Sequence, residues 1–176
     1  MENEKILIIA PHPDDETLGL GGTISKLSKN NDVFILVVSG HLPPLYSNQD
    51  YLITENEAKR AFKILGVKNF DFLKIPATKV SDLPIYDLNK IIYNFFQIFK
   101  PSVVFCPFPD RHIDHKLIFE SVMVCSRPIG IGKNIKIFGA YETLSETHWN
   151  APDIEPNFVP NMIIDISDFI KIKLKA

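Results

Sequence analysis

The sequence Lys5-Ile6-Leu7-Ile8-Ile9-Ala10-Pro11-His12-Pro13-Asp14-Asp15-Glu16 joins an unbroken apolar run to one imidazole and three carboxylates. The β-branched run Lys5–Ala10 is typical of a strand that is covered on both faces, as in parallel sheets. Acidic residues suit the positive end of a following helix, which we predict over Thr17–Lys29. The stretch therefore predicts a buried strand, a polar turn and a helix. It places charged groups at the carboxyl end of a strand, where open α/β sheets bind ligands.

The rest of the chain alternates segments typical of strands with segments typical of helices. This alternation predicts βαβ units and a Rossmann-like, three-layer α/β domain with a mainly parallel sheet. Because the 176 residues contain no internal repeat and no linker, we expect one domain over residues 1–176. The further strands that we predict are Asp32–Ser39, Phe70–Ile75, Ser102–Cys106, Lys136–Tyr141 and Met162–Ile166. The further helices are Tyr51–Leu65, Ile85–Phe99, Asp114–Cys125 and a final one capped by Ser167 or Asp168, and the loops are Gly40–Asp50, Pro107–Arg111 and Glu142–Pro160.

The composition excludes several classes of protein. The formal net charge is −2, and the chain has no long basic or acidic block, so we expect no nucleic-acid partner. No apolar segment approaches the ~18–20 residues that span a bilayer, and the N-terminus lacks the pattern of a signal peptide. Cys106 and Cys125 form neither a short-spaced metal pair nor a disulfide framework. We therefore expect a cytoplasmic protein without a membrane span, and a homo-oligomer is compatible with the sequence.

A second polar cluster, His112-Ile113-Asp114-His115, follows the predicted strand Ser102–Cys106 and a Pro-bounded loop. Neutral imidazole nitrogen and carboxylate oxygen are both ordinary Zn²⁺ ligands. His12 and Asp15 lie three residues apart across a tight turn, and His115 can supply a third ligand from the start of its own helix. We therefore predict that the two clusters meet around one metal ion that keeps positions open for water and a carbonyl oxygen.

The remaining polar residues of the two clusters suit hydrolysis. Asp14 lies between two predicted ligands, where it can act as a base beside the metal-activated water without binding the ion. His112, three residues before His115, is placed to donate a hydrogen bond to the oxyanion that forms on attack. Asp114 is placed to orient the His112 imidazole and keep it protonated, as carboxylates around metal sites often do.

A purely structural interpretation of these residues is the main alternative. Acidic residues at the start of a helix are usually caps and partners of the helix dipole, and Asp14 or Glu16 alone would be read in that way. His41 and His148 lie in predicted loops and have no assigned role. The structural interpretation weakens because two such clusters follow two separate strands that are expected to end at the same edge of the sheet.

The sequence resembles the LmbE-like (PIG-L) N-acetylglucosaminyl deacetylases over nearly its whole length. The HPDDE and HxDH matches are highly specific, whereas the others are weak alone. The segments that carry the resemblance are Pro11–Thr23 (A-H-P-D-D-E-x-x-x-x-G-G in the family), Glu57, Ala61 and Leu65-Gly66 (E-x-x-x-A-x-x-x-L-G), Asp110–His115 (D-x-H-x-D-H), Pro160-Asn161, Asp165–Ser167 and Lys171–Ala176.

The resemblance implies a zinc hydrolase with a Rossmann-like fold that removes N-acetyl groups from amino sugars and glycoconjugates. Position by position, it implies zinc ligation by His12, Asp15 and His115, with Asp14 as the general base, His112 as the stabiliser of the tetrahedral intermediate and Asp114 as the residue that orients His112. These roles agree with those that the chemistry of the residues predicts, and the resemblance makes the substrate class specific.

Two departures from the family pattern affect this prediction. Members often have a substrate-binding Arg three residues before the helix Glu, and Thr54 stands at that position here. Arg111 or Lys59 can compensate, and we favour Arg111 as a substrate-binding residue because it adjoins His112. The sequence ends at Ala176, where relatives continue the last helix, so we expect either a C-terminal truncation or a naturally short member.

The sequence thus predicts a Zn²⁺-dependent deacetylase that acts on a small-molecule N-acetyl sugar or sugar conjugate, although an N/O site selects Zn²⁺ only weakly over Fe²⁺ or Co²⁺. One alternative is a metal-dependent phosphoesterase that acts on nucleotides or sugar phosphates. Another is a non-catalytic nucleotide-binding module, because Gly19-Leu20-Gly21-Gly22 loosely resembles a phosphate loop. Trp149, in a predicted loop, suits either stacking on a sugar ring or ordinary packing.

Overall fold

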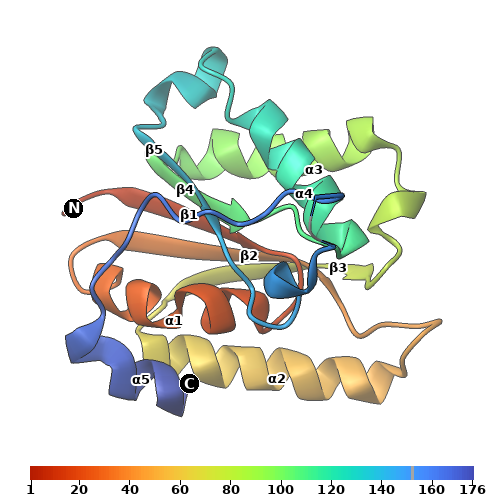
Figure 1. Ribbon diagram of the computed structural model, residues 1–176, viewed down its shortest axis with the longest axis horizontal. Coiled ribbons are helices and arrows are strands. Elements are labelled where there is room, and N and C mark those ends of the chain that lie inside the picture. Colours follow the sequence, from red (N-terminus) through yellow and green to blue (C-terminus); the bar gives the residue numbers. More distant parts are fainter. Residues whose placement is uncertain (152) are drawn as a thin grey trace.

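A five-stranded, all-parallel sheet forms the centre of the computed structural model, which describes residues 1–151 and 153–176 (Figure 1). The spatial order is β3-β2-β1-β4-β5, and Ile8 of β1 pairs with Ile35 of β2 and Phe105 of β4. The order reverses at β1 and β4, which creates the switch point where such sheets bind ligands. The strands are β1 (Lys5–Ala10), β2 (Asp32–Gly40), β3 (Asn69–Pro76), β4 (Val103–Pro107) and β5 (Ile137–Tyr141).

Helices cover both faces of the sheet, which confirms the predicted three-layer α/β fold (Figure 1). On one face Ile6 and Ile8 pack with Phe62, and on the other Leu7 and Ile9 pack with Phe96. Successive residues of β1 point to opposite faces, so burial on both sides explains the unbroken apolar run. One face carries α1 (Asp15–Leu27), α2 (Asn48–Leu65) and α5 (Ile170–Lys175), and the other carries α3 (Ile85–Phe99) and α4 (Ile113–Cys125). None of the described helices is both long and apolar enough to cross a membrane.

The glycines of α1 serve close packing. A Cβ atom at Gly19 would overlap the Glu142 carbonyl oxygen and the Tyr141 ring, and one at Gly22 would overlap the Ile166 side chain. Both glycines lie inside α1, whereas a phosphate loop lies between a strand and a helix. Their surroundings are therefore filled by the chain itself, and they offer no cradle for a nucleotide.

Helix α2 begins three residues before the predicted start at Tyr51. The Ser47 side chain accepts a hydrogen bond from the Asp50 backbone N–H, and the Asp50 carboxylate accepts one from the Ser47 backbone N–H. This reciprocal pair forms a capping box, so the helix starts at Asn48, inside the predicted loop Gly40–Asp50. The helix ends, as predicted, at Gly66, which adopts a left-handed conformation with φ of 83°.

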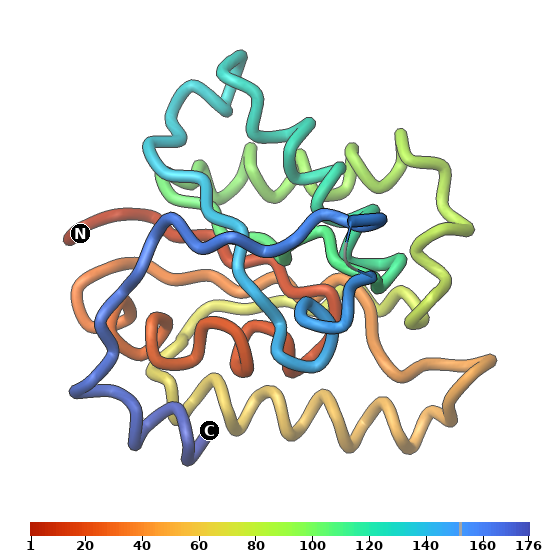
Figure 2. The backbone as a smooth tube through the Cα atoms, in the orientation of Figure 1, coloured from red at the N-terminus to blue at the C-terminus, as the bar shows by residue number. Residues whose placement is uncertain are grey.

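The predicted strand Met162–Ile166 is wrong, because this segment has no regular secondary structure and the sheet ends at β5. Ile163 is 88% exposed, and Ile166 is half-buried against Gly22 of α1, so the segment lies outside the sheet. The segment instead crosses the molecule as an extended connection to α5 (Figure 2). The predicted loop Glu142–Pro160 contains the short 3₁₀ turn Thr147–Trp149, and its Pro152 lies outside the described residues.

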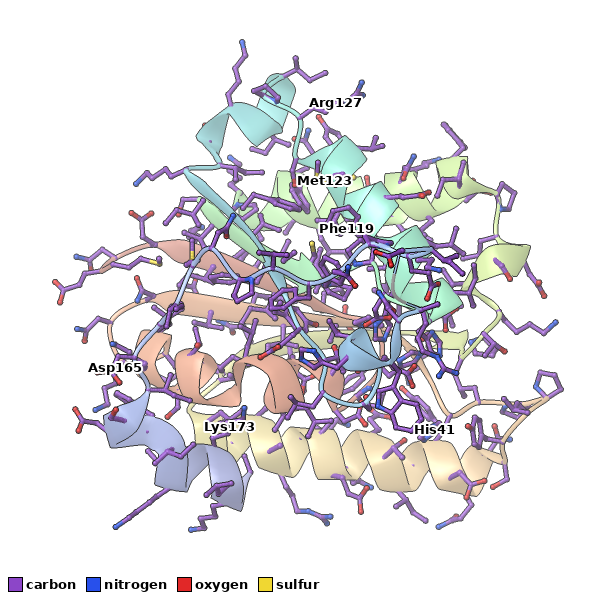
Figure 3. All side chains as sticks on the ribbon, in the orientation of Figure 1. His41, Phe119, Met123, Arg127, Asp165 and Lys173 are labelled. Atoms are coloured by element: carbon purple, nitrogen blue, oxygen red, sulfur yellow. The ribbon has the colours of Figure 1, made fainter. Side chains whose placement is uncertain are left out.

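The C-terminal segment is anchored on α1. Lys26 Nζ donates a hydrogen bond to the Asp165 carbonyl oxygen at 2.9 Å, and the Lys173 side chain lies against Gly21. Asp165 and Lys173 mark the two ends of this anchor in Figure 3. The final helix was predicted with Ser167 or Asp168 as its cap. In the structure a 3₁₀ turn, Ser167–Phe169, leads into α5, and its Ser167 N–H donates to the Asp165 carboxylate.

Candidate metal centre

Three imidazoles from the two polar clusters meet beyond the carboxyl ends of β1 and β4. His12 follows β1 by two residues, and His112 forms the N-cap of α4. The ring centroids of His12 and His112 are 4.6 Å apart, those of His112 and His115 are 4.9 Å apart, and those of His12 and His115 are 5.5 Å apart. The fold thus brings together residues that are about one hundred positions apart, at the sheet edge that the sequence indicated.

One ligand atom from each of His12, Asp15 and His115 lies within 4.8 Å of the other two. Asp15 Oδ2 is 3.0 Å from His12 Nδ1 and 3.2 Å from His115 Nε2. Two ligands of a tetrahedral ion with bonds of ~2.0–2.1 Å lie about 3.3 Å apart. His115 Nε2 is buried and has no hydrogen-bond partner among the described residues. The donor set and its spacing therefore fit a divalent cation such as zinc.

The His12 ring is held from both sides. Nδ1 faces Asp15, and Nε2 lies 3.1 Å from Asp114 Oδ2, which also accepts the Thr78 backbone N–H at 2.7 Å. The Asp114 carboxylate thus fixes the ring while the Nδ1 side faces the candidate ligands. A second set of ligand atoms, from His12, His112 and Asp114, also lies within 4.8 Å and belongs to the same cluster.

Asp110, which has no separate role in the predicted site, contacts both His115 and His112. Asp110 is fully buried, and its Oδ2 lies 3.0 Å from His115 Nδ1. Its Oδ1 accepts the His112 backbone N–H at 3.0 Å. The signal for it was its place as the first residue of the D-x-H-x-D-H element. Only the fold shows that this carboxylate lies against the His115 ring.

Asp14 immediately precedes the candidate ligand Asp15 and is exposed. It occupies the N-cap position of α1, yet its side chain makes no capping hydrogen bond, so the structural alternative for this residue lacks its expected contact. The side chain reaches solvent, but partial desolvation raises the pKa of its carboxyl group, and the negative charge of Asp15 raises it further. A carboxylate without a capping partner and with a raised pKa is suited to accept a proton.

His112 is oriented by the backbone of Asp114. The Asp114 N–H donates to His112 Nδ1 at 3.2 Å, so the neutral ring carries its proton on Nε2. Burial lowers the pKa of His112, and the neighbouring charges of His12 and His115 lower it further. The predicted pairing of the Asp114 carboxylate with His112 differs from this arrangement, because that carboxylate contacts His12 instead. His112 is therefore a neutral donor beside the cluster.

The carboxylates of Asp15, Asp110 and Asp114 make the cluster strongly attractive to positive charge. Burial opposes protonation of His12, but the hydrogen bonds to Asp114 and Asp15 outweigh it and raise the pKa of His12 to about 10. The hydrogen bond to Asp110 and the nearby negative charge of Asp15 likewise outweigh burial and raise the pKa of His115 to about 9. Burial would raise the pKa of Asp15, yet its contacts with the two imidazoles lower it. In the absence of metal, protons supply the charge that a cation would supply.

Glu16 is part of the protein interior. It is fully buried, and its Oε1 accepts the Thr17 hydroxyl at 2.6 Å. Burial raises the pKa of Glu16 to about 8, so the side chain is mostly protonated at neutral pH. The Glu of the HPDDE stretch is thus a buried structural group, in keeping with the structural interpretation.

Arg111, the predicted substrate-binding residue, lies at the rim. Its Nε is 3.3 Å from Glu146 Oε2, and its guanidinium carbon lies 5.8 Å from the ring centroid of Trp149. Trp149 is 69% exposed, so the ring is open to a ligand. The other candidate, Lys59, is paired with Glu55 at 2.6 Å.

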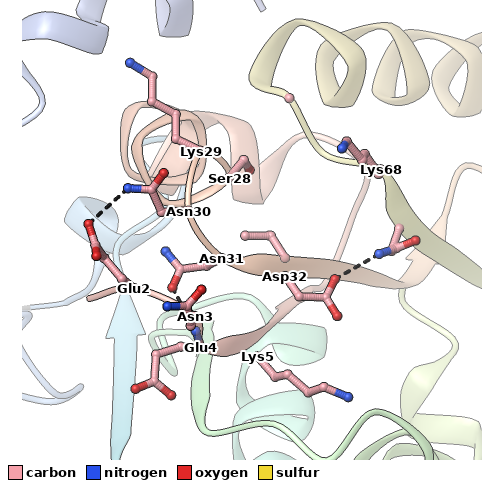
Figure 4. Close-up of a pocket in the computed structure, with 13 residues that line it drawn as sticks. Glu2, Asn3, Glu4, Lys5, Ser28, Lys29, Asn30, Asn31, Asp32 and Lys68 are labelled. Atoms are coloured by element: carbon pink, nitrogen blue, oxygen red, sulfur yellow. Dashed lines mark hydrogen bonds between the residues drawn. The ribbon is translucent and has the colours of Figure 1, made fainter.

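A separate hollow lies at the opposite end of the sheet (Figure 4). Its volume is about 840 Å³, and Lys5, Asp32 and Asn69 at the starts of β1, β2 and β3 line it. Its hydrogen bonds run between exposed side chains, such as Asn69 Nδ2 donating to Asp32 Oδ1 at 3.0 Å. This groove contains none of the residues that the sequence indicated, so it is separate from the cluster of His12, Asp15 and His115.

The chain belongs to the PIG-L family, because the family model described as GlcNAc-PI de-N-acetylase matches residues 7–126. This match confirms the resemblance that the sequence motifs indicated. The matched range includes both polar clusters, most of β1 and all of β2, β3 and β4.

Similar proteins include named deacetylases. Diacetylchitobiose deacetylase of Thermococcus kodakarensis is 31% identical, with 98% of this chain and 67% of the relative covered. The Bacillus anthracis protein named "Probable N-acetyl-alpha-D-glucosaminyl L-malate deacetylase 2" is 27% identical, with 100% of this chain and 80% of the relative covered. The structure of N,N′-diacetylchitobiose deacetylase from Pyrococcus horikoshii, complexed with an inhibitor, superposes with a TM-score of 0.71 at 27% identity and covers 98% of this chain and 67% of the other.

Proposed function

We propose that this protein is a zinc-dependent hydrolase that removes the N-acetyl group from an N-acetylated amino sugar or glycoconjugate. The observation that carries the proposal is the convergence of His12, Asp15 and His115 at the sheet edge of a chain that belongs to the PIG-L family. The names of its relatives, deacetylases of diacetylchitobiose and N-acetylglucosaminyl malate, support the substrate class.

His12, Asp15 and His115 would hold the zinc ion. When bound, the ion supplies a Lewis acid that polarises the acetyl carbonyl and lowers the pKa of water at the site. The protein contributes the orientation of both imidazoles, because Asp114 contacts His12 Nε2 and Asp110 contacts His115 Nδ1. Such contacts fix which ring nitrogen is free to bind.

Asp14 is the general base in this proposal. Its carboxylate accepts a proton from the water that attacks the acetyl carbon, and its raised pKa brings it closer to the working pH. The same proton then passes from Asp14 to the amine nitrogen as the C–N bond breaks. The products are acetate and a free amino sugar, and the carboxylate of Asp14 is regenerated.

His112 stabilises the oxyanion of the tetrahedral intermediate. With Nδ1 occupied by the Asp114 N–H, the Nε2–H of the neutral ring is free to donate to the developing negative charge. Because a neutral His112 already carries this proton, its donor role requires no further protonation. Arg111 and Trp149 at the rim are the candidates for contact with the sugar, by charge and by stacking respectively.

Acetate release from a panel of N-acetylated sugars and sugar conjugates tests the proposal. We expect release from at least one member, loss of release after chelation, and recovery when one equivalent of zinc is returned. Sugar phosphates and nucleotides in the same panel test the phosphoesterase alternative. Phosphate release without acetate release, or acetate release that chelation leaves unchanged, would contradict the proposal.

A further inference from the structure

We infer that Thr147 and Asp110 act as a positioning pair that fixes the His115 ring, and with it one side of the metal site. The inference rests on the proposed function, because it takes His115 as a metal ligand. Asp110 Oδ2 contacts His115 Nδ1 at 3.0 Å and accepts the Thr147 hydroxyl at 2.9 Å. Asp110 and His115 are fully buried and Thr147 is 2% exposed, so water does not replace these contacts.

The direction of the Thr147 hydrogen bond follows from its partners. The Thr143 backbone N–H donates to Thr147 Oγ1 at 2.8 Å. A carboxylate only accepts, so the hydroxyl proton must point to Asp110. Thr147 thus receives one hydrogen bond and donates another, and both of its partners are buried. A hydroxyl with this geometry defines where the Asp110 oxygen lies.

The position of Asp110 in turn selects the tautomer of the neutral His115 ring. Since its carboxylate accepts from Nδ1, that nitrogen carries the proton, and the lone pair of the neutral ring is on Nε2. Nε2 is buried, has no hydrogen-bond partner in the part of the chain that the structure describes, and lies 3.2 Å from Asp15 Oδ2. The pair therefore aims the free nitrogen of His115 at the other candidate ligands.

The same turn links the metal site to its rim. Thr147 belongs to the 3₁₀ turn Thr147–Trp149, which also carries the exposed Trp149, and the preceding Glu146 contacts Arg111. Thr147 lies 37 residues from Asp110 in the sequence, so the contact ties the segment after β5 to the segment after β4. A substitution at Thr147 therefore acts on the metal through Asp110, without touching the ion.

Zinc affinity of three variants tests the inference by competition with a chromophoric chelator. Asp110→Asn should weaken zinc binding by about 10–100-fold, the usual effect of losing the partner of a metal-binding imidazole. Thr147→Val removes the hydroxyl at nearly constant volume and should weaken binding by about tenfold, at the low end of that range. Thr147→Ser keeps the hydroxyl and should bind as the wild type does. Denaturation of each metal-free variant checks that it folds.

The inference would be wrong if a folded Thr147→Val protein bound zinc as tightly as the wild type does. It would also be wrong if Thr147→Val and Thr147→Ser lost zinc affinity equally. Neither result would contradict the proposed function. Absence of zinc binding by the wild type would overturn the proposed function and this inference together. If a variant does not fold, an NMR measurement on the wild-type protein still tests the inference. Long-range ¹H–¹⁵N NMR of the zinc-loaded protein should show the His115 proton on Nδ1, and a proton on Nε2 would contradict the inference.

Discussion

The two ends of the parallel sheet differ in what their polar side chains do. At the amino ends, Lys5, Asp32 and Asn69 line a groove of about 840 Å³ in which the polar groups are exposed (Figure 4). At the carboxyl ends, Asp110 and His115 have no exposed surface and lie in mutual contact.

Burial of charged groups is costly unless other groups compensate it. A compact set of buried carboxylates and imidazoles is therefore better evidence of function than a large hollow with solvated walls. The carboxyl end is also the side on which ligands bind in doubly wound sheets. The comparison supports the proposal that the chemistry takes place at the carboxyl ends of β1 and β4.

A matched pair of Asp→Asn variants tests the two ends against each other. Asp14→Asn should lower kcat by about 10²–10⁴-fold, the usual contribution of a general base, while zinc stays bound. Asp32→Asn, at the amino end, should leave kcat unchanged. Steady-state kinetics with zinc analysis of both proteins is the measurement, and full activity in Asp14→Asn would remove the base from the mechanism.

Substitution of two histidines at the carboxyl end of the sheet compares the contribution of the cluster with that of its surroundings. His112→Ala should lower kcat by about 10²–10³-fold, as removal of one oxyanion donor does. His148→Ala is the control, because His148 is exposed and its ring lies against Glu142 and Phe158, not against the three imidazoles of the cluster. Comparable kcat values for the two variants would show that proximity to His12 and His115 does not give His112 a special role.

Substitution of one glycine at each end of the sheet compares how tightly the two ends are packed. Gly19→Ala should cost about 1–3 kcal/mol of stability, because the new methyl meets the Glu142 carbonyl and the Tyr141 ring. Gly66→Ala, beside the amino-end groove, should cost about 1–2 kcal/mol because φ is 83°. Chemical denaturation measures both costs. Activity of the folded protein should fall only for Gly19→Ala, and an equal fall in both would contradict the comparison.

The metal-free protein should lose stability as the pH rises. The pKa values of His12 and His115 are raised to about 10 and 9 from a usual 6.5, so their contribution is complete below pH 6.5 and is lost as the pH passes through 9 to 10. Glu16, with a pKa of about 8, acts in the same direction.

Thermal unfolding in chelator, compared with unfolding in zinc, measures the effect. The stabilisation by zinc should grow over this pH range because protons compete with the metal. A metal-free melting temperature that rises from pH 6.5 to 9.5 would contradict the charge arrangement of the cluster.

Much of the fold followed from short-range patterns in the sequence. The apolar run Lys5–Ala10 implied a strand buried on both faces, and the alternation of elements implied a parallel sheet. These two inferences were sufficient to bring His12 and His115 to one edge, because parallel strands share their carboxyl ends. The start of α2 was also encoded locally, in Ser47 and Asp50, but was missed.

Other features depend on tertiary contacts that local patterns do not encode. Met162–Ile166 has the composition of a strand, yet its backbone remains outside the sheet and Ile163 is exposed. The contact of Thr147 with Asp110 joins two loops, and the pairing of Asp114 with His12 in place of His112 depends on side-chain orientation. No spacing rule predicts such contacts.

Anomalous diffraction at the zinc edge, on crystals grown with one equivalent of zinc, tests the central claim most directly. We predict one peak within about 2.0–2.2 Å of ligand atoms from His12, Asp15 and His115. A map without density there, or with its only peak in the amino-end groove, would contradict the account.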